Sequence, residues 1–462
     1  MLRLLDHLAS SDVMRIRNRP PVCIVLQTVR GWTHSHGAII LESEQDSMNI
    51  LAMIMAGGKG ERLMPLTEHR SKPAVPFAAK YRIVDFVLSN FLNSTIRSLY
   101  VLVQYRSQSL IEHLRRAWRI GERQPNEFVS VVPPQMRTRS GWYEGTADAV
   151  YQNMNLLRDF KPDLVAVFGA DHIYRMDINQ MVQFHLDHHA DITVAARPVP
   201  VHAAQGFGII EVAEKQGAPH IVGFQEKPKH PKVMPSDPGQ AFSSMGNYLF
   251  NARLLQDILE HDAKTPGSHD FGRDILPRAI GSHRILAYNF CHNHIPGLKP
   301  YEEPNYWRDV GTLEAYWQAN MDILGETPLF DLHNTGWPIL TDNYDAPPSS
   351  LIRAHLDNSV VGQGSRIVEA EISRSVIGRD ITIERGAALD ECIILDGAVI
   401  GAKSRLRRVI VDRFNHIPDG TSIGFDAAAD RKRFQVGRSG LVVLPQWHTT
   451  DQASLYQHPT LH

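Results

Sequence analysis

The chain has 462 residues, and its 48 Lys and Arg are balanced by 50 Asp and Glu to give a formal net charge of −2 at pH 7. The two signs are interspersed, which excludes the strongly basic surface typical of proteins that bind nucleic acid or anionic membranes, and no apolar run approaches the roughly 20 residues of a membrane-spanning helix. Because Cys23, Cys291 and Cys392 lie far apart and form no C-x-x-C motif, we expect no disulfide framework and no zinc site, but a cytoplasmic protein with small-molecule partners.

The first 47 residues differ from the rest. They carry Arg15, Arg17 and Arg19 before a Pro-Pro pair, and they lack the charged start, apolar core and cleavage site of a secretory signal. Met48 stands directly before the first long apolar run. We therefore expect residues 1–47 to be a poorly ordered extension and the folded core to begin at Met48.

A glycine-rich turn follows the apolar run at residues 50–55, which predicts a buried parallel strand. Gly57 and Gly58 have no side chains, so the backbone there can approach a polyphosphate with its N–H groups exposed. Arg62 and Lys72 then supply positive charge. The order of residues fits neither a Walker loop nor a Rossmann dinucleotide fingerprint, which indicates a different nucleotide chemistry.

Residues 48–325 alternate short apolar runs with longer amphipathic stretches, the pattern of strands joined by crossover helices. We expect a doubly wound, Rossmann-like α/β domain with a mostly parallel sheet and helices on both faces. In such sheets, ligands bind beyond the carboxyl ends of the strands. The expected strands are 50–55, 99–103, 164–168 and 192–196, and the expected helices are 86–93, 107–118, 147–157 and 179–188.

The rest of the chain has a different pattern. Prolines interrupt residues 326–350, which we interpret as a linker, and residues 441–462 are assigned to a tail. Between them, over residues 351–440, imperfect hexapeptide repeats predict a short left-handed parallel β-helix, which should pack on the first domain or on another subunit. The alternative is a β-sandwich with glycines at chance positions. The repeated aliphatic-glycine pairs are Val361-Gly362, Ile377-Gly378, Ile400-Gly401 and Ile423-Gly424.

Two aspartates stand where a divalent cation could bind. Asp171 follows the expected strand 164–168, and Asp309 precedes an amphipathic stretch at 313–324. A carboxylate at a strand end, opposite a phosphate-binding turn, suits Mg²⁺, which takes oxygen ligands and bridges to phosphates. The alternative is a structural role, in a turn for Asp171 and as a helix cap for Asp309.

Two further positions could bind a substrate. Lys227 is fixed between an apolar stretch and Pro228, so its ammonium could bind a sugar phosphate. Tyr143 lies in a glycine-containing turn that opens an expected helix, where it could contact the base, the ribose or the sugar.

Five longer motifs carry a family resemblance: Arg70-Ser71-Lys72-Pro73-Ala74-Val75-Pro76-Phe77, Tyr81-Arg82-Ile83-Val84-Asp85-Phe86, Gly169-Ala170-Asp171-His172-Ile173-Tyr174, His269-Asp270-Phe271-Gly272 and Tyr306-Trp307-Arg308-Asp309-Val310-Gly311-Thr312-Leu313-Glu314-Ala315-Tyr316-Trp317. Over residues 50–423 the chain resembles the bacterial glucose-1-phosphate adenylyltransferases, which are sugar nucleotidyltransferases. The resemblance implies Mg²⁺-dependent transfer of AMP from ATP to glucose 1-phosphate, giving ADP-glucose and pyrophosphate for glycogen synthesis without a covalent intermediate. It also implies a homotetramer that responds to allosteric metabolites.

The resemblance also implies roles for individual residues. Arg62 and Lys72 would hold the triphosphate and act in catalysis together with Asp171, which would share Mg²⁺ with Asp309. Since glucose 1-phosphate is already an anion at neutral pH, catalysis needs positioning and charge neutralisation but no general base. The residues expected to contact substrate are Gly57, Gly58, Tyr143, Gly208, Glu226, Lys227 and Ser244.

Regulation is expected at His69 and Arg82. Family members that fructose 1,6-bisphosphate activates carry lysine at the position of His69. Their AMP-linked histidine corresponds to Pro76, whereas their AMP-linked arginine is kept as Arg82. We therefore expect a weak response to both of these effectors.

Three other functions stay open at this point. A nucleotidyltransferase that uses UTP or dTTP would share the glycine turn and the carboxylates. A non-catalytic regulatory subunit would bind effectors and stabilise an active partner, although the complete set of charged residues argues against it. A hexapeptide-repeat acyltransferase is disfavoured because the repeat tract is short and irregular.

Overall fold

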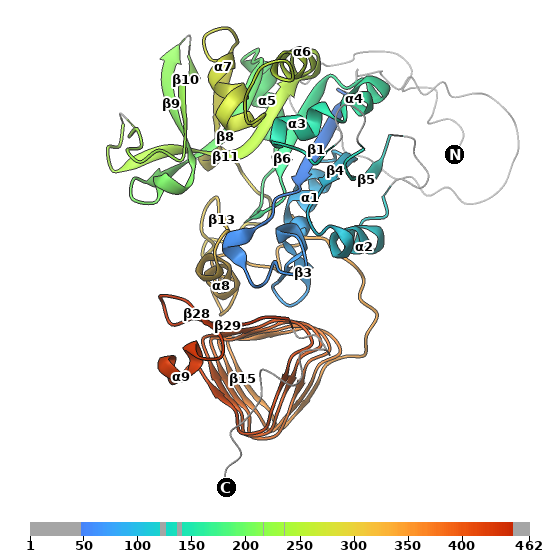
Figure 1. The fold of residues 1–462 in the computed structure, drawn as a ribbon, viewed down its shortest axis with the longest axis vertical. Coiled ribbons are helices and arrows are strands. Elements are labelled where there is room, and N and C mark those ends of the chain that lie inside the picture. Colours follow the sequence, from blue (N-terminus) through green and yellow to red (C-terminus); the bar gives the residue numbers. More distant parts are fainter. Residues whose placement is uncertain (1–47, 121–125, 136–140, 216, 235, 447–462) are drawn as a thin grey trace, which may run out of the picture. The chain divides into compact units, whose positions relative to one another are not determined.

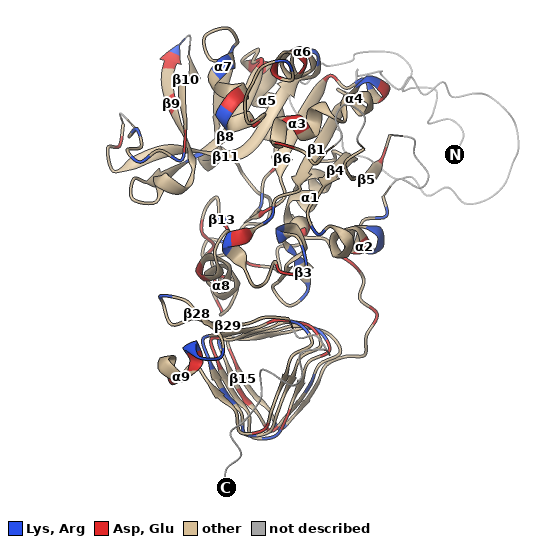
Figure 2. Ribbon diagram, in the orientation of Figure 1, with Lys and Arg blue, Asp and Glu red and all other residues tan. Residues whose placement is uncertain are grey.

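The computed structural model describes residues 48–120, 126–135, 141–215, 217–234 and 236–446 (Figure 1). The expected extension over residues 1–47 and most of the expected tail, residues 447–462, lie outside the described residues. Within the described ranges, no helix is both long and apolar enough to cross a membrane. Lys and Arg are interspersed with Asp and Glu along the ribbon, in line with the small net charge (Figure 2).

Nine strands of the first domain form one sheet, in the order β5, β4, β1, β6, β11, β8, β12, β10, β9. Strands β5, β4, β1 and β6 are parallel, but β11 runs antiparallel to β6 and β8, and β10 runs antiparallel to β12 and β9. Because β12 is parallel to β8, the sheet is mostly parallel as predicted, and the exceptions are β11 and β10, whose direction the apolar pattern of a strand does not encode. The strands are β1 (Ile50–Ala56), β4 (Ser98–Val103), β5 (Phe128–Val132), β6 (Leu164–Gly169), β8 (Ile192–Pro200), β9 (Gly208–Lys215), β10 (Ala218–Glu226), β11 (Gln240–Asn251) and β12 (Ile285–Asn289).

Helices cover both faces of this sheet. Leu51 and Met53 of β1 belong to a buried cluster with residues of α3, α4 and α6, whereas Ala52 and Ile54 belong to a second cluster with residues of α1, α2 and α5. This alternation is what a strand buried on both faces requires. The single helix expected over residues 147–157 is two helices, α3 and α4. The helices are α1 (Ile83–Asn93), α2 (Gln108–Ala117), α3 (Thr146–Tyr151), α4 (Met154–Phe160), α5 (Ile178–Asp187), α6 (Ala252–Asp262), α7 (Leu276–Ala279), α8 (Leu313–Met321) and, in the second domain, α9 (Ala427–Arg431).

The second domain is a parallel β-helix built from three sheets of short strands. Ile367, Ile383, Ile400 and Ile417 pair in register on successive strands and are completely buried, so the aliphatic residues of the repeat stack inward. This parallel pairing excludes the β-sandwich alternative. Strand β29 pairs with β25, so the third sheet continues past residue 440 into the part that we assigned to the tail. The strands are β14 (Ser350–Ile352), β17 (Arg366–Val368), β20 (Thr382–Ile383), β23 (Val399–Ile400) and β26 (His416–Ile417) in the first sheet, β15 (His355–Asp357), β18 (Glu371–Ser373), β21 (Ala388–Asp390), β24 (Arg405–Arg407) and β27 (Ser422–Ile423) in the second, and β16 (Val360–Val361), β19 (Val376–Ile377), β22 (Ile393–Ile394), β25 (Val409–Val411), β29 (Val442–Leu444) and β28 (Gln435–Val436) in the third.

The two domains share an apolar cluster. Trp317 of α8 lies in this cluster with Ile393 of the β-helix, and its Nε1 donates a hydrogen bond of 2.9 Å to the backbone oxygen of Glu391. The segment between the domains is also held on the first domain, because Asn93 Nδ2 donates to the backbone oxygen of Pro338 at 2.9 Å. The β-helix therefore packs on the first domain, as we expected because a short β-helix has an open end that must be covered.

Candidate active site

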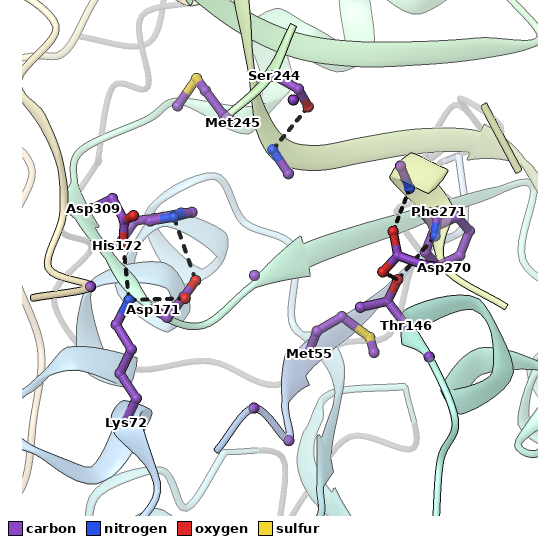
Figure 3. A pocket seen from close by; sticks show the side chains of 18 of the residues that line it. Met55, Lys72, Thr146, Asp171, His172, Ser244, Met245, Asp270, Phe271 and Asp309 are labelled. Carbon is purple, nitrogen blue, oxygen red and sulfur yellow. Dashed lines mark hydrogen bonds and ion pairs between the residues drawn. The ribbon is translucent and has the colours of Figure 1, made fainter. Parts of the chain in front are cut away.

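A cavity of about 760 Å³ opens at the carboxyl ends of β1 and β6, where the fold class predicts ligand binding. Figure 3 shows Lys72, Asp171 and Asp309 together on one side of this cavity and Asp270 on the other. All the residues that we expected to contact substrate or cation line it: Gly57, Gly58, Arg62, Lys72, Tyr143, Asp171, Gly208, Glu226, Lys227, Ser244 and Asp309.

The glycine turn after β1 presents its backbone to the cavity. A Cβ at Gly58 would meet no atom within 4 Å, so this part of the backbone faces open space. Gly60 has a φ of +65°, and a Cβ there would lie 3.0 Å from Lys72 Cβ. Thr67 Oγ1 donates a hydrogen bond of 2.9 Å to the Gly60 oxygen and fixes the turn. A fixed turn that exposes backbone N–H groups is suited to binding phosphate oxygens.

Lys72 lies between two carboxylates. Its Nζ is 3.0 Å from Asp171 Oδ2 and 3.0 Å from Asp309 Oδ1, and its side chain is buried. Burial alone would lower the pKa of Lys72, but the two carboxylates outweigh it and raise the pKa above its ordinary value. Partial burial likewise opposes ionisation of Asp171, yet the Lys72 ammonium holds the pKa of this carboxyl well below its usual range. Arg62 is mostly exposed, and its Nη2 is 3.9 Å from Asp309 Oδ2.

Asp171, His172 and Asp309 form a group that could hold a divalent cation, because one ligand atom from each lies within 4.8 Å of the others. Strands β7 (His172–Tyr174) and β13 (Trp307–Asp309) pair antiparallel, with Asp309 directly opposite His172. The oxygen atoms of two carboxylates fit a hard cation such as Mg²⁺. Our sequence analysis missed His172 as a member of this group, although it lies in a motif that carries the family resemblance.

A second set of polar groups lies at the end of β10, at the start of β9 and in the middle of β11. Glu226 Oε1 is 3.2 Å from Lys227 Nζ, and half of the Lys227 side chain is exposed. Gly208 lies opposite this pair, and a Cβ there would come within 2.6 Å of Phe224 Cζ and 3.0 Å of Glu226 Oε2. Ser244 Oγ accepts a hydrogen bond of 3.2 Å from the backbone N–H of Gly246. These groups can bind the hydroxyls and the phosphate of a sugar phosphate.

Sequence reasoning missed several groups that line the cavity. Gln104 holds Tyr143 by two hydrogen bonds, since its Oε1 accepts from Tyr143 N at 2.8 Å and its Nε2 donates to Tyr143 O at 3.3 Å. Asp270 accepts from Thr146 Oγ1 at 2.9 Å and from Gly272 N at 2.9 Å. Gln104 directly follows the expected strand 99–103, and this strand-end position is the signal that could have identified it.

Arg82 lies away from this cavity. It lines a second cavity, of about 290 Å³, together with Arg379 and Arg413 of the β-helix. Burial and the charge of Arg413 lower the pKa of Arg82 to about 10. His69 is not among the residues that line these two cavities. The two positions expected to act in regulation are therefore not brought together in either cavity.

Comparison with known proteins agrees with both domains. Residues 51–326 match the nucleotidyl transferase family, and residues 348–444 match the GlmU-like C-terminal hexapeptide family. Glucose-1-phosphate adenylyltransferases from Thermodesulfovibrio yellowstonii, an Anaeromyxobacter species and Photobacterium profundum are 49%, 46% and 43% identical to this chain. The matches cover 86% of this chain and 96%, 98% and 98% of these relatives. The chain belongs to the glucose-1-phosphate adenylyltransferase family of nucleotidyl transferases.

Proposed function

We propose that this chain transfers AMP from ATP to glucose 1-phosphate, giving ADP-glucose and pyrophosphate. The observation that carries the proposal is the contact of Lys72 with both Asp171 and Asp309 beside the glycine turn. One cavity thereby combines a backbone suited to phosphate, a fixed ammonium and two carboxylates for a cation. The names of the relatives support ATP and glucose 1-phosphate as the substrates.

The two substrates would enter from opposite parts of the cavity. The triphosphate of ATP would lie on the backbone N–H groups of Gly57 and Gly58, with Arg62 at the open side. Glucose 1-phosphate would lie near the end of β10, where Lys227 can bind its phosphate and Glu226 can accept hydrogen bonds from sugar hydroxyls. Both substrates would then place a phosphate group near Lys72, and the positive charge of Lys72 would reduce the repulsion between the two phosphates.

The reaction needs no nucleophilic side chain. A phosphate oxygen of glucose 1-phosphate forms a bond to the α-phosphorus of ATP, the bond from that phosphorus to the bridging oxygen breaks, and pyrophosphate leaves with the electron pair. No proton has to be removed, because the attacking phosphate is already an anion. The main obstacle is repulsion between two polyanions, and Lys72, Arg62 and Lys227 supply the opposite charge.

Asp171 and Asp309 would hold a divalent cation, which we propose to be Mg²⁺, and the bound ion would neutralise phosphate charge during the transfer. The fit rests on the donor set, which has two carboxylates next to a phosphate-binding backbone. The Lys72 ammonium keeps Asp171 ionised at neutral pH, so this carboxylate is ready to accept the cation without losing a proton.

The test is pyrophosphate release by the purified full chain with Mg²⁺ and glucose 1-phosphate, comparing ATP with UTP, dTTP, GTP and CTP. We expect a clear preference for ATP. A preference for UTP or dTTP would support nucleotidyl transfer but would contradict ATP as the substrate. No release with any nucleotide, with candidate activators added, would contradict the enzyme activity and favour a regulatory subunit.

The resemblance supports four further proposals: a homotetramer, a left-handed winding of the β-helix, a role in glycogen synthesis in the cytoplasm, and control by anionic metabolites. An anionic effector would bind in the second cavity, which is lined by Arg82, Arg379 and Arg413.

Two of these proposals can be tested directly. Light scattering after size-exclusion chromatography measures the number of subunits in the oligomer. Dose-response curves with fructose 1,6-bisphosphate and AMP measure the control, and we expect both responses to be weak because His69 and Pro76 replace the usual basic residues.

A further inference from the structure

His172 lies against the two carboxylates of the proposed cation site. Its Nε2 is 3.5 Å from Asp171 Oδ1, and the pairing of β7 with β13 places it directly opposite Asp309. Figure 3 shows the His172 ring beside both aspartates. The register of a two-stranded ribbon therefore brings an imidazole to the same point as two carboxylates.

The imidazole is largely but not fully buried, and it lacks the hydrogen bonds that a histidine in such a place normally makes. Among the described residues, the buried Nδ1 of His172 has no hydrogen-bond partner, and the contact of Nε2 with Asp171 is longer than a normal hydrogen bond. The ring is held by packing instead, since the Trp307 ring lies 4.7 Å away between centroids at an interplanar angle of 48°. A ring that is fixed but poorly hydrogen-bonded is available to bind a cation.

The four carboxylate oxygens divide among Lys72, His172 and Arg62, the last of which faces Asp309 Oδ2 at 3.9 Å. Lys72 Nζ contacts Asp171 Oδ2 and Asp309 Oδ1, whereas His172 Nε2 faces the remaining oxygen of Asp171, Oδ1. Neighbouring ligands of an octahedral cation with bonds of about 2.1 Å lie about 3 Å apart. The separation of 3.5 Å between Nε2 and Oδ1 therefore needs only a small closure to fit two neighbouring ligand positions.

We propose that His172 is a third protein ligand of the cation, through Nε2, and that its nitrogen raises the affinity of the site for Mn²⁺ and Co²⁺ more than its affinity for Mg²⁺. Mg²⁺ favours oxygen ligands, whereas imidazole favours transition-metal ions and binds Co²⁺ more strongly than Mn²⁺. This inference rests on the proposed function only in placing a cation at Asp171 and Asp309. It adds a residue that changes the relative affinities of the site for these cations.

The test measures Mn²⁺ binding to the full chain in the presence of ADP-glucose, without relying on turnover. Pulsed electron paramagnetic resonance of bound Mn²⁺ detects the ¹⁴N nucleus of a coordinated imidazole. The first variant is His172→Phe, which keeps a ring against Trp307 but has no ligand atom, and the second is His172→Gln, in case the first fails to fold. The control is His292→Asn, because His292 is exposed and lies outside the cavity.

We expect imidazole modulation in the wild-type protein and in His292→Asn, and its loss in both His172 variants. The Kd for Co²⁺ should rise in these variants by about tenfold or more, the scale of losses at metal sites, and the Kd for Mg²⁺ should rise less. Bound Mn²⁺ without imidazole modulation in the wild-type protein would overturn the proposal. Absence of any Mn²⁺ binding would overturn it too, and the pyrophosphate assay would then show separately whether the proposed reaction stands.

Discussion

Arg70 Nη1 donates a hydrogen bond of 2.9 Å to Asp412 Oδ1, although 342 positions separate the two residues in the chain. Both side chains are almost fully buried. Asp412 directly follows β25 of the β-helix, and Arg70 comes two positions before Lys72. The β-helix therefore holds, through a buried ion pair, the segment that carries the central ammonium of the active site.

Replacing one partner of this pair should destabilise the protein. In Asp412→Ala the Arg70 guanidinium stays buried without its counter-charge, so we expect the free energy of unfolding to fall by about 3–5 kcal/mol. Urea-induced unfolding at neutral pH, followed by circular dichroism, measures the loss.

The matched control is an exposed ion pair of the same β-helix. Arg374 Nη2 lies 2.8 Å from Asp390 Oδ1, but about half of the Arg374 side chain is exposed. Solvent screens such a pair, so Arg374→Ala should cost less than about 1 kcal/mol. Equal losses in the two variants would show that the buried pair has no special role.

Removing the phosphate-facing charges should slow the chemistry. Lys72→Ala and Arg62→Ala should each lower kcat by roughly 10²- to 10³-fold, the effect of losing one charged or hydrogen-bonding group at a transition state. Steady-state pyrophosphate release measures kcat. Lys232→Ala is the control, because this lysine is exposed and does not line the cavity. Near wild-type rates in both Lys72→Ala and Arg62→Ala would remove these residues from the catalytic set.

Gly208 should contribute to binding the sugar phosphate, for a steric reason. In Gly208→Ala the new methyl group would lie 2.6 Å from Phe224 Cζ and 3.0 Å from Glu226 Oε2, so both side chains must move. Loss of a hydrogen bond from a charged group costs about 1.5–3 kcal/mol, and kcat/KM for glucose 1-phosphate should therefore fall by about tenfold to a hundredfold.

Gly206 provides the control for this variant. A Cβ at Gly206 would meet no atom within 4 Å, although Gly206 lines the same cavity two positions away. Gly206→Ala should therefore leave kcat/KM for glucose 1-phosphate close to the wild-type value. A similar loss in both alanine variants would mean that backbone flexibility, and not the contact with Phe224 and Glu226, explains the effect.

Parts of the fold could be predicted because they depend on local patterns. The apolar run that became β1 is buried on both faces, and the stacked isoleucines of the β-helix follow from the hexapeptide period. The direction of β11 could not be predicted, since it depends on pairing with β6 and β8 from distant parts of the chain. The extent of the β-helix was missed because α9 interrupts the repeat before β29 returns to the third sheet.

Some residues of the candidate site could likewise be predicted from local sequence, and others could not. Gln104 directly follows β4 and Asp171 comes two positions after β6, so a strand-end rule points to both, although we applied it only to Asp171. The place of Lys72 between two carboxylates depends on three distant segments meeting, and the place of His172 depends on the register of β7 against β13. Neither relationship leaves a periodic signal in the sequence.

Acid should lower the stability of the protein by protonating one buried ion pair of the linker. Arg379 Nη2 lies 2.8 Å from Asp342 Oδ1, and both side chains are largely buried. Burial alone would raise the pKa of Asp342, but the hydrogen bond and charge of Arg379 outweigh it and lower the pKa below the ordinary value. As the pH falls, the Asp342 carboxylate takes up a proton in the unfolded chain before it does so in the folded chain. The ion pair therefore contributes its full stability above about pH 4, and this stability is lost as the pH falls through the lowered pKa of the folded state.

Arg379→Gln should remove most of this pH dependence. Without the guanidinium, burial is opposed only by the charges of His113 and Arg116, so the pKa of Asp342 in the folded variant rises relative to the folded wild type. The variant should therefore be less stable than the wild type near pH 6, and the difference should shrink as the pH falls to about 3.5. Urea unfolding across this range measures the difference, with Arg385→Gln, which removes an exposed pair with Glu369, as the control. A difference between Arg379→Gln and wild type that stays constant with pH would show that Arg379 stabilises the linker by packing and not by its charge.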